Sequence, residues 1–335
     1  MNQLGILLLL DSPENLQFGI DNSQWIVGKK FKGVQGIPFG THYVHYSLKE
    51  EGYQFKQGFF FIVSPENKYL VKQWNSELQE FLTFKDCAPY IHTLEMHDFD
   101  LYLGIYPMDK YEVWKQCVNL INRKVLDKLD PIKNVCVEEY NDKDIGSNNP
   151  LHSTIYYTDI PKLKNPSKSH GQQLTALNFD KSTIVEELLK SEYQNEYSLL
   201  LGEIQYAFVK FLLGEHFESF EQWKQLLILI TSCERLIEEQ TSFFIDFIPV
   251  FYHQLQQMPN DFFVDPISSS NFIQSCIKNL IELSQNDNPN LIRQKLIQRC
   301  NKLKELIKVK FVQDVVQAED EDEPVVVEDF NFIQL

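Results

Sequence analysis

The chain has 335 residues and a formal net charge of −16, from 31 Lys and Arg against 47 Asp and Glu. This length predicts two domains, because single domains commonly hold about 100–200 residues. The acidic balance disfavours non-specific nucleic-acid binding, since the phosphate backbone repels an acidic protein. It leaves open a local basic patch and favours a search for basic partners.

The first apolar stretch, residues 4–10, is followed at once by Asp11. A membrane span needs about 20 apolar residues, and a secretory signal needs a basic start. We therefore expect this stretch to be a buried first strand. The six cysteines are scattered without a CxxC pair, which predicts a reduced, intracellular compartment.

Residues 1–163 are predicted to form a sheet-dominated α+β domain. Apolar, aromatic or β-branched runs of strand length lie at residues 6–10, 24–27, 42–47, 57–63 and 69–73, with a further strand-like run at 154–158. Apolar residues recur at helical spacing in residues 74–81 and 109–129, which are therefore predicted to be helices. The glycines Gly28, Gly33, Gly36 and Gly40 are interpreted as turn residues, because the Lys and Ser/Thr of a phosphate-binding loop do not follow them.

The composition changes at residues 164–182, which we interpret as a linker. Residues 183–318 then predict an all-helical domain, an antiparallel bundle or short solenoid. Its expected helix starts are a capping box of Thr183 and Glu186, a second cap at Ser219, and Asn288 followed by Pro289. Helices are expected over 200–212, from 219 onward, and over 243–257, 272–283 and 291–310.

Residues 319–335 form a third kind of segment. An acidic block at 319–323 predicts a flexible tether. The strand-prone string that follows suits pairing with an exposed sheet edge of a partner. Composition equally allows this tail to pair with the chain's own N-terminal sheet or to stay disordered. The expected tail-strand residues are Val325, Val326, Val327, Glu328 and Phe330.

Two groups of residues offer alternative functions. His92, His97, Asp98 and Asp100 could hold a metal for hydrolysis, although solvated side chains around a turn explain them better. His42 and His45 lie three apart on a predicted strand and should face opposite sides of it, which disfavours chelation. Arg and Lys dominate residues 293–310 and would suit an acidic partner or RNA, or simply a solvated helix face. No common catalytic motif is present.

The N-terminal block resembles the signature of the A1-alpha2-repression splicing-factor family. The matching residues here are Phe18, Gly19, Ile20, Asp21, Trp25, Gly28, Pro38, Gly40, His42, His45 and Tyr46. Similar segments follow in order, among them Leu200-Leu201-Gly202-Glu203, Tyr252-His253-Gln254-Leu255 and Pro324-Val325-Val326-Val327-Glu328. The resemblance spans nearly the whole chain, but residues 141–172 match poorly.

The resemblance implies a β-sandwich-like first domain, a VHS-like helical second domain and no enzymatic activity or cofactor. Family members assemble the U5 small nuclear ribonucleoprotein (snRNP). They bind the RNase H-like and Jab/MPN-like domains of the large central spliceosomal scaffold protein and hold off a helicase. The tail lies as a strand between those two domains. We further expect a chain that is monomeric by itself, binds no nucleic acid or membrane, and occurs in cytoplasm and nucleus. Ser268, Ser269 and Ser270 are candidate phosphorylation sites for release.

Overall fold

The protein is described by a computed structural model, which covers residues 4–48, 56–83, 86–131, 155–161, 180–259, 270–285 and 290–320. The chain divides into two compact units, Met1–Glu238 and Glu239–Leu335. None of the described helices is long and apolar enough to cross a membrane.

The N-terminal part of the first unit is built from two sheets. The five-stranded sheet has the order β8-β7-β1-β4-β9 and the four-stranded sheet has the order β3-β2-β5-β6. The strands are β1 (Gly5–Leu10), β2 (Gln17–Ile20), β3 (Ser23–Ile26), β4 (Gly33–Ile37), β5 (Gly40–Ser47), β6 (Gln57–Val63), β7 (Tyr69–Asn75), β8 (Glu80–Thr83) and β9 (Leu103–Ile105).

Strand β1 shows how the sheets are covered. Leu7 and Leu9 point into the core between the two sheets, while Leu8 and Leu10 point to the other face. There they pack with Leu94 of helix α1 (Ala88–Glu95). A strand that is buried on both faces needs a continuous apolar run, which explains the sequence GILLLL.

The inner faces of both sheets contribute to one apolar core. Its buried residues are Leu7, Leu9, Leu16, Phe18, Ile20, Val27, Val34, Ile37, Val44, Tyr46, Phe59, Phe61, Val63, Phe81 and Tyr106. Two sheets that bury a shared face form a sandwich. The predicted sandwich-like first domain is therefore confirmed.

The predicted helix at residues 74–81 is wrong. Strand β7 continues to Asn75, and β8 returns antiparallel to it after a tight turn. Trp74 and Phe81 face each other across this hairpin, with ring centroids 5.0 Å apart. A spacing of seven residues places two apolar side chains on the same face of a helix, two turns apart. In this protein Trp74 and Phe81 are instead partners on adjacent strands.

Two of the glycines interpreted as turn residues lie inside strand β4 instead. Gly33 has φ 131° and Gly36 has φ 76°, conformations that other residues rarely adopt. A side chain at Gly33 would also overlap the Leu7 carbonyl oxygen, at 1.9 Å from the added Cβ. The strands β2, β4 and β9 escaped the sequence analysis because they are short and glycine-containing.

The expected helix over 109–129 is divided. A short η2 turn (Met108–Lys110) leads into α2 (Tyr111–Val118), and α3 (Arg123–Leu129) begins anew. Asn122 is the N-cap of α3, because its side-chain oxygen accepts a hydrogen bond from the Val125 amide at 3.1 Å.

Four further helices complete the first unit: α5 (Ser182–Ser191), α6 (Tyr197–Leu212), α7 (Phe217–Ile230) and α8 (Glu234–Glu239). The predicted caps Thr183 and Ser219 are wrong. Asp180 accepts hydrogen bonds from the amides of Ser182 and Glu234 and so serves the starts of both α5 and α8. The His216 side chain caps α7 by accepting from the Ser219 amide.

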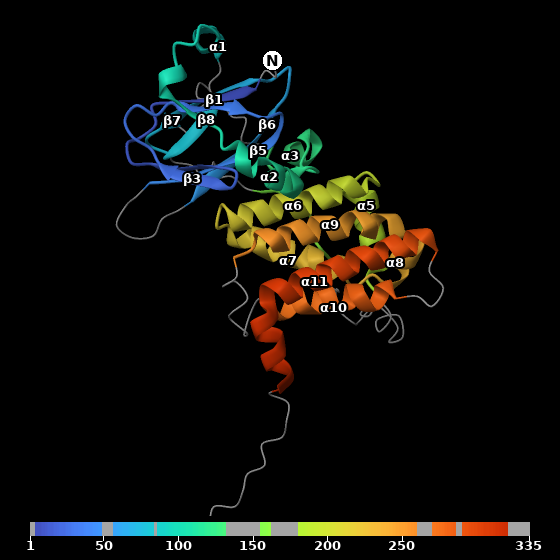
Figure 1. Ribbon diagram of the computed structural model, residues 1–335. Helices are drawn as coiled ribbons and strands as arrows, with labels where there is room; N and C mark the ends of the chain where they lie inside the picture. The colour runs from blue at the N-terminus through green and yellow to red at the C-terminus, as the bar shows by residue number, and fades with distance from the viewer. Residues whose placement is uncertain are drawn as a thin grey trace, which may run out of the picture. The chain divides into compact units, whose positions relative to one another are not determined.

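The second unit contains α9 (Thr241–Gln257), α10 (Ser270–Ser284) and α11 (Leu291–Asp320), and α11 packs against both others (Figure 1). Asn290 caps α11 by accepting from the Arg293 amide at 2.8 Å. The predicted cap Asn288 and the following Pro289 lie outside the described residues.

The chain is thus α+β, with a β-sheet domain followed by a helical region, as predicted. The VHS-like character of the helices remains a prediction. So do the boundaries 163/164, 182/183 and 318/319, because the expected linker lies almost wholly outside the described residues.

Gly202 of α6 is a position where the fold tolerates no side chain. An added Cβ would lie 2.7 Å from the Leu120 carbonyl oxygen and 2.7 Å from a Val125 methyl group. We predict that Gly202→Ala lowers the free energy of unfolding by about 1–3 kcal/mol, through overpacking. Thermal unfolding measures this, with Gly28→Ala as control because its Cβ would meet nothing within 4 Å. Equal melting temperatures for both variants would contradict the prediction.

Candidate functional site

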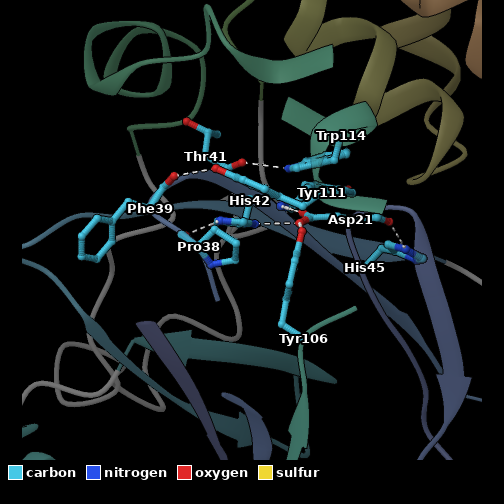
Figure 2. A network of polar contacts seen from close by, with 10 residues as sticks. Asp21, Pro38, Phe39, Thr41, His42, His45, Tyr106, Tyr111 and Trp114 are labelled. Atoms are coloured by element: carbon cyan, nitrogen blue, oxygen red, sulfur yellow. Dashed lines mark hydrogen bonds and ion pairs between the residues drawn. The ribbon is translucent and has the colours of Figure 1, made fainter. Parts of the chain in front are cut away.

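Four of the residues that carry the family resemblance, Asp21, Pro38, His42 and His45, meet in a buried polar network (Figure 2). Asp21 occupies the tight turn between β2 and β3, with φ 53°. Its Oδ2 lies 2.6 Å from His42 Nδ1 and accepts a hydrogen bond from the Tyr106 hydroxyl at 2.7 Å. Its Oδ1 accepts from the Tyr43 amide at 2.8 Å. The carboxylate therefore joins β2, β5 and the segment after β9.

The network fixes His42 completely. Its Nε2 donates to the Pro38 carbonyl oxygen at 2.9 Å, and its Nδ1 is within hydrogen-bond distance of Asp21 Oδ2 at 2.6 Å. The His42 side chain is wholly buried. Burial raises the pKa of Tyr106, and the Asp21 carboxylate raises it further. Such a set resembles an acid–base triad in composition, but a fully enclosed imidazole cannot reach a substrate. Its role is to hold the sandwich together.

A second row of contacts attaches α2 to this network (Figure 2). The Trp114 indole donates to the Thr41 carbonyl oxygen at 2.9 Å, and the Tyr111 hydroxyl donates to the Phe39 carbonyl oxygen at 2.8 Å. The Thr41 hydroxyl donates to the Ile121 carbonyl oxygen at 2.5 Å. These bonds connect α2 and the turn after it to β5.

His45 lies on the opposite face of β5 from His42, as the strand geometry predicted. Its ring covers Gly19, where an added Cβ would lie 2.2 Å from the imidazole. Its Nε2 lies 3.3 Å from the Asp21 carbonyl oxygen. Burial, assisted by the Lys56 charge, lowers the pKa of His45 to about 4. His45 is therefore neutral in the folded protein at ordinary pH.

The remaining described motif residues serve packing or turns. Phe18 and Trp25 make an edge-to-face contact at 5.5 Å, and the Tyr46 hydroxyl accepts from the Phe81 amide at 3.2 Å. Ile20 is fully buried, Gly28 lies in a turn, and Gly40 begins β5. The family signature thus describes a core rather than a catalytic or binding surface.

A second buried network is centred on Glu203 of α6. Its Oε1 accepts from the Thr158 amide and the Gln222 side chain, each at 2.9 Å. Its Oε2 accepts from Lys128 at 2.9 Å and from the Tyr193 hydroxyl at 3.0 Å. Glu203 is 1 % exposed. Side chains or amides from four other segments of the first unit therefore converge on one carboxylate of α6.

The Thr158 contact corrects the predicted strand at 154–158. Residues 155–161 adopt no regular secondary structure. The Tyr156 amide donates to the Leu129 carbonyl oxygen at 2.9 Å, and the Tyr157 hydroxyl donates to Ser219 at 2.6 Å. Hydrogen bonds to side chains and to the last carbonyl of α3 hold this segment in place. A strand would instead form a ladder of backbone hydrogen bonds with a neighbouring strand.

Two more polar residues of α6 join it to the sandwich and its attached helices. Gln205 accepts from the Leu120 amide at 2.8 Å and donates to Asn119 at 2.8 Å. The Lys210 ammonium donates to the Gly58 carbonyl oxygen of β6 at 3.2 Å and lies 5.5 Å from the centre of the Tyr43 ring. Sequence reasoning missed Gln205 and Lys210 and noted Glu203 only within a segment that resembles the family, although each of the three interrupts an apolar stretch and so signals a buried polar contact.

A cavity of about 290 Å³ lies beside the Glu203 network. Lys124 and Lys128 line it, but both ammonium groups are engaged, by Glu196 at 2.7 Å and by Glu203 at 2.9 Å. Neither ammonium group is therefore left to bind an anionic ligand.

The alternative metal site at His92, His97, Asp98 and Asp100 is not formed. His97 Nδ1 lies 3.0 Å from Asp100 Oδ2, and the two side chains are 78 % and 41 % exposed. No group of three or more His, Cys, Asp or Glu side chains that could hold a metal occurs in the described ranges. His92 lies within α1, and the other three residues lie in the turns that follow this helix.

The basic residues of α11 divide into two kinds. Arg293 is 4 % exposed and donates to the carbonyl oxygens of Ser284, at 3.1 Å, and Leu283, at the end of α10. A cation at a helix C-terminus is a stabilising feature. Lys295, Lys302, Lys304 and Lys308 are exposed, and Lys308 pairs with Glu305 at 3.2 Å. RNA or acidic-partner binding by this face stays a prediction.

Most of the remaining predicted site residues lie in segments 260–269 and 321–335. Ser268, Ser269 and the tail residues Val325, Val326, Val327, Glu328 and Phe330 lie outside the described residues. Ser270 is the first residue of α10.

Comparison with known proteins identifies the family. The model of the AAR2 N-terminal domain matches residues 3–131, and that of the AAR2 C-terminal repeat region matches residues 157–315. The chain belongs to the AAR2 family. The "Protein AAR2 homolog" of Mus musculus is 27 % identical over 359 residues, covering 96 % of this chain and 93 % of that protein.

Two further relatives carry the same name. The "Protein AAR2 homolog" of Homo sapiens is 28 % identical, over 81 % of this chain and 80 % of that protein. The one of Caenorhabditis elegans is 29 % identical, over 82 % of this chain and 85 % of that protein. Membership of the AAR2 family makes this a splicing-related protein and agrees with the resemblance found in the sequence.

We predict that Glu203→Gln lowers the free energy of unfolding by about 3–5 kcal/mol, because Lys128 and the other donors lose their buried carboxylate. Chemical denaturation measures the change. The matched control is Glu196→Gln, whose partner Lys124 is well exposed and whose loss should cost less than about 1 kcal/mol. Similar costs for both variants would show that the Glu203 network stabilises little.

His45 predicts a specific pH dependence. The unfolded chain protonates this residue at its ordinary pKa of 6.5, while the folded protein resists protonation down to about pH 4. The free energy of unfolding should therefore fall as pH falls through this window, with a His45 contribution of about 3 kcal/mol. Denaturation at pH 7 and at pH 4.5 tests this against His45→Gln. The variant should show a shallower pH dependence, and an identical slope would contradict the assignment.

Proposed function

We propose that the protein is a non-enzymatic assembly factor of the U5 snRNP. It binds the RNase H-like and Jab/MPN-like domains of the central spliceosomal scaffold protein and keeps a helicase from binding early. The observation that carries this proposal is the match of both AAR2 family models, which together cover residues 3–131 and 157–315.

The internal bonding of the first unit fits a binding protein of fixed shape. Buried polar side chains of α6 pair with β6, with the turn after α2 and with α3. A preorganised surface loses little conformational freedom on association and can hold partner domains in a defined arrangement. This rigidity supports a steric mode of action and requires no catalytic residue or cofactor.

In this proposal the tail segment adds a strand between the two partner domains. Backbone pairing by Val325, Val326 and Val327 follows once the folded part has docked, because tethering raises the effective concentration of the tail. Glu328 and Phe330 extend the contact. Phosphorylation at Ser268, Ser269 or Ser270 would assist release by adding negative charge. The protein would act in cytoplasm and nucleus, as a monomer before it binds.

Truncation tests the role of the tail. A chain that ends at Glu323 should still bind one scaffold domain but fail to join both, whereas the full chain should assemble the three-component complex. The matched control ends at Phe330 and keeps the proposed strand. Binding is measured by analytical ultracentrifugation of purified components.

The outcomes separate the possible errors. Equal assembly by all three chains would contradict the tail strand and leave binding to the folded part. Absence of binding by the full chain would contradict the proposed function itself. A phosphomimetic Ser270→Asp that leaves binding unchanged would count against that release site.

A further inference from the structure

The described part of the sandwich has one sheet edge that is lined by exposed apolar side chains. It runs along β9 and the short turns on either side of it. The members, here named the β9 patch, are Leu101, Tyr102, Ile105 and Met108, which are between 38 % and 94 % exposed. Leu101 and Ile105 are the most exposed, at 94 % and 81 %.

The backbone of β9 is paired on one side. It runs parallel to β4 in the register Gly33 to Leu103 and Gln35 to Ile105. The Tyr102 carbonyl oxygen accepts from the Lys32 amide at 2.9 Å, and the Tyr106 amide donates to the Gln35 carbonyl oxygen at 2.9 Å. Since alternate residues of a strand bond to the same side, the amide and carbonyl groups of Leu103 and Ile105 point away from β4. In the described part of the chain no strand lies on that side.

Strand β9 contains only Leu103, Gly104 and Ile105, and short length is one of the features that keep sheet edges from aggregating. The apolar side chains exposed around this short strand are its unusual feature. By contrast β8, at the other edge of the same sheet, exposes no large apolar side chain. Apolar exposure concentrated at one open edge indicates a binding surface.

Charge indicates what kind of segment could bind. Residues 95–112 contain five carboxylates, Glu95, Asp98, Asp100, Asp109 and Glu112, and a single lysine, Lys110. One further cation, Lys32, lies beside this segment, 5.9 Å from the centre of the Phe99 ring, so negative charges still predominate. The chain's own strand-prone tail follows the acidic block 319–323 and contains Glu328 and Asp329. Like charges therefore disfavour the tail as the occupant. A segment with basic residues at its ends complements the carboxylates.

We propose that the β9 edge binds an extended segment of a protein partner, apolar at alternate positions and basic at its ends. The segment would pair with the outward amide and carbonyl groups of Leu103 and Ile105. Its apolar side chains would cover Leu101, Ile105 and Met108. This surface is distinct from the tail strand of the proposed function and does not depend on it.

The test uses the full chain and a synthetic peptide in which alternating Val and Thr residues are flanked by two Lys at each end. Fluorescence anisotropy gives the affinity, and hydrogen exchange with mass spectrometry locates the contact. The peptide should bind and slow exchange in residues 101–108. A version with Glu in place of every Lys should bind at least about ten-fold more weakly. Failure of the Lys peptide to bind, or protection elsewhere only, overturns the proposal.

Two substitutions separate the apolar and backbone contributions. Ile105→Thr keeps a β-branched residue and should weaken binding about ten-fold through lost apolar burial. Ile105→Pro removes one outward amide and should abolish strand addition without touching the bonds to β4. Val309→Thr, at a residue 79 % exposed on α11, is the matched control and should change nothing. Unchanged binding by the Ile105 variants overturns the proposal.

Other occupants give recognisable results. If residues 101–108 are protected in the full chain but exposed in a chain ending at Glu323, the tail covers the edge and the proposal is wrong. If the protein alone has twice its monomer mass by light scattering, and Ile105→Pro restores the monomer, a second copy covers the edge and the proposal is equally wrong.

Discussion

Helix α6 is buried on every side, and the rest of the first unit depends on how its polar side chains are paired. All residues from Leu199 to Lys210 are buried. A helix in this position must find a partner for every polar side chain, because an unpaired buried charge is costly. Glu203, Gln205 and Lys210 all find partners on neighbouring elements. The packing of α6 therefore determines the positions of the elements around it.

These bonds explain why the sandwich and the helices α5–α8 form one compact unit. Lys210 reaches β6, Gln205 reaches the turn after α2, and Glu203 holds α3 together with α7. Gly202 allows the close approach that brings these groups within bonding distance. The Asp21–His42 network plays the matching role inside the sandwich, where it fixes β2 and β5 to the segment after β9. Both networks are enclosed, which suits a protein that acts by shape.

The sequence was most informative where burial imposes a simple pattern. Strand β6 and the helices α6 and α9 follow from periodicity, because each presents an apolar stripe or run. The β7–β8 hairpin was misassigned since Trp74 and Phe81 suit a helical spacing as well as a cross-strand pair. Helix caps were misplaced because Asp180 serves the starts of both α5 and α8, although it lies 54 residues from Glu234 in the chain. No local pattern reveals such a contact.

The candidate networks were beyond prediction for the same reason. Asp21 and Tyr106 are 85 residues apart, and Lys210 and Gly58 are 152 apart. Family resemblance located the residues of the Asp21 network but not their role, which only their burial reveals. Of the Glu203 network, the sequence analysis noted Glu203 itself, and only as the last residue of a segment that resembles the family. The tail strand and two of the three candidate phosphorylation sites lie outside the described residues and stay predictions.

The central claim is that α6 makes the sandwich and the helices of the first unit a single cooperative structure. Native-state hydrogen exchange at increasing denaturant concentration tests this directly, since it gives the opening free energy of each segment. Amides of β5, β6 and α6 should converge on one opening free energy and one dependence on denaturant. Protection of β5 and β6 that persists after α6 has exchanged would show that the sandwich stands alone, and would contradict the claim.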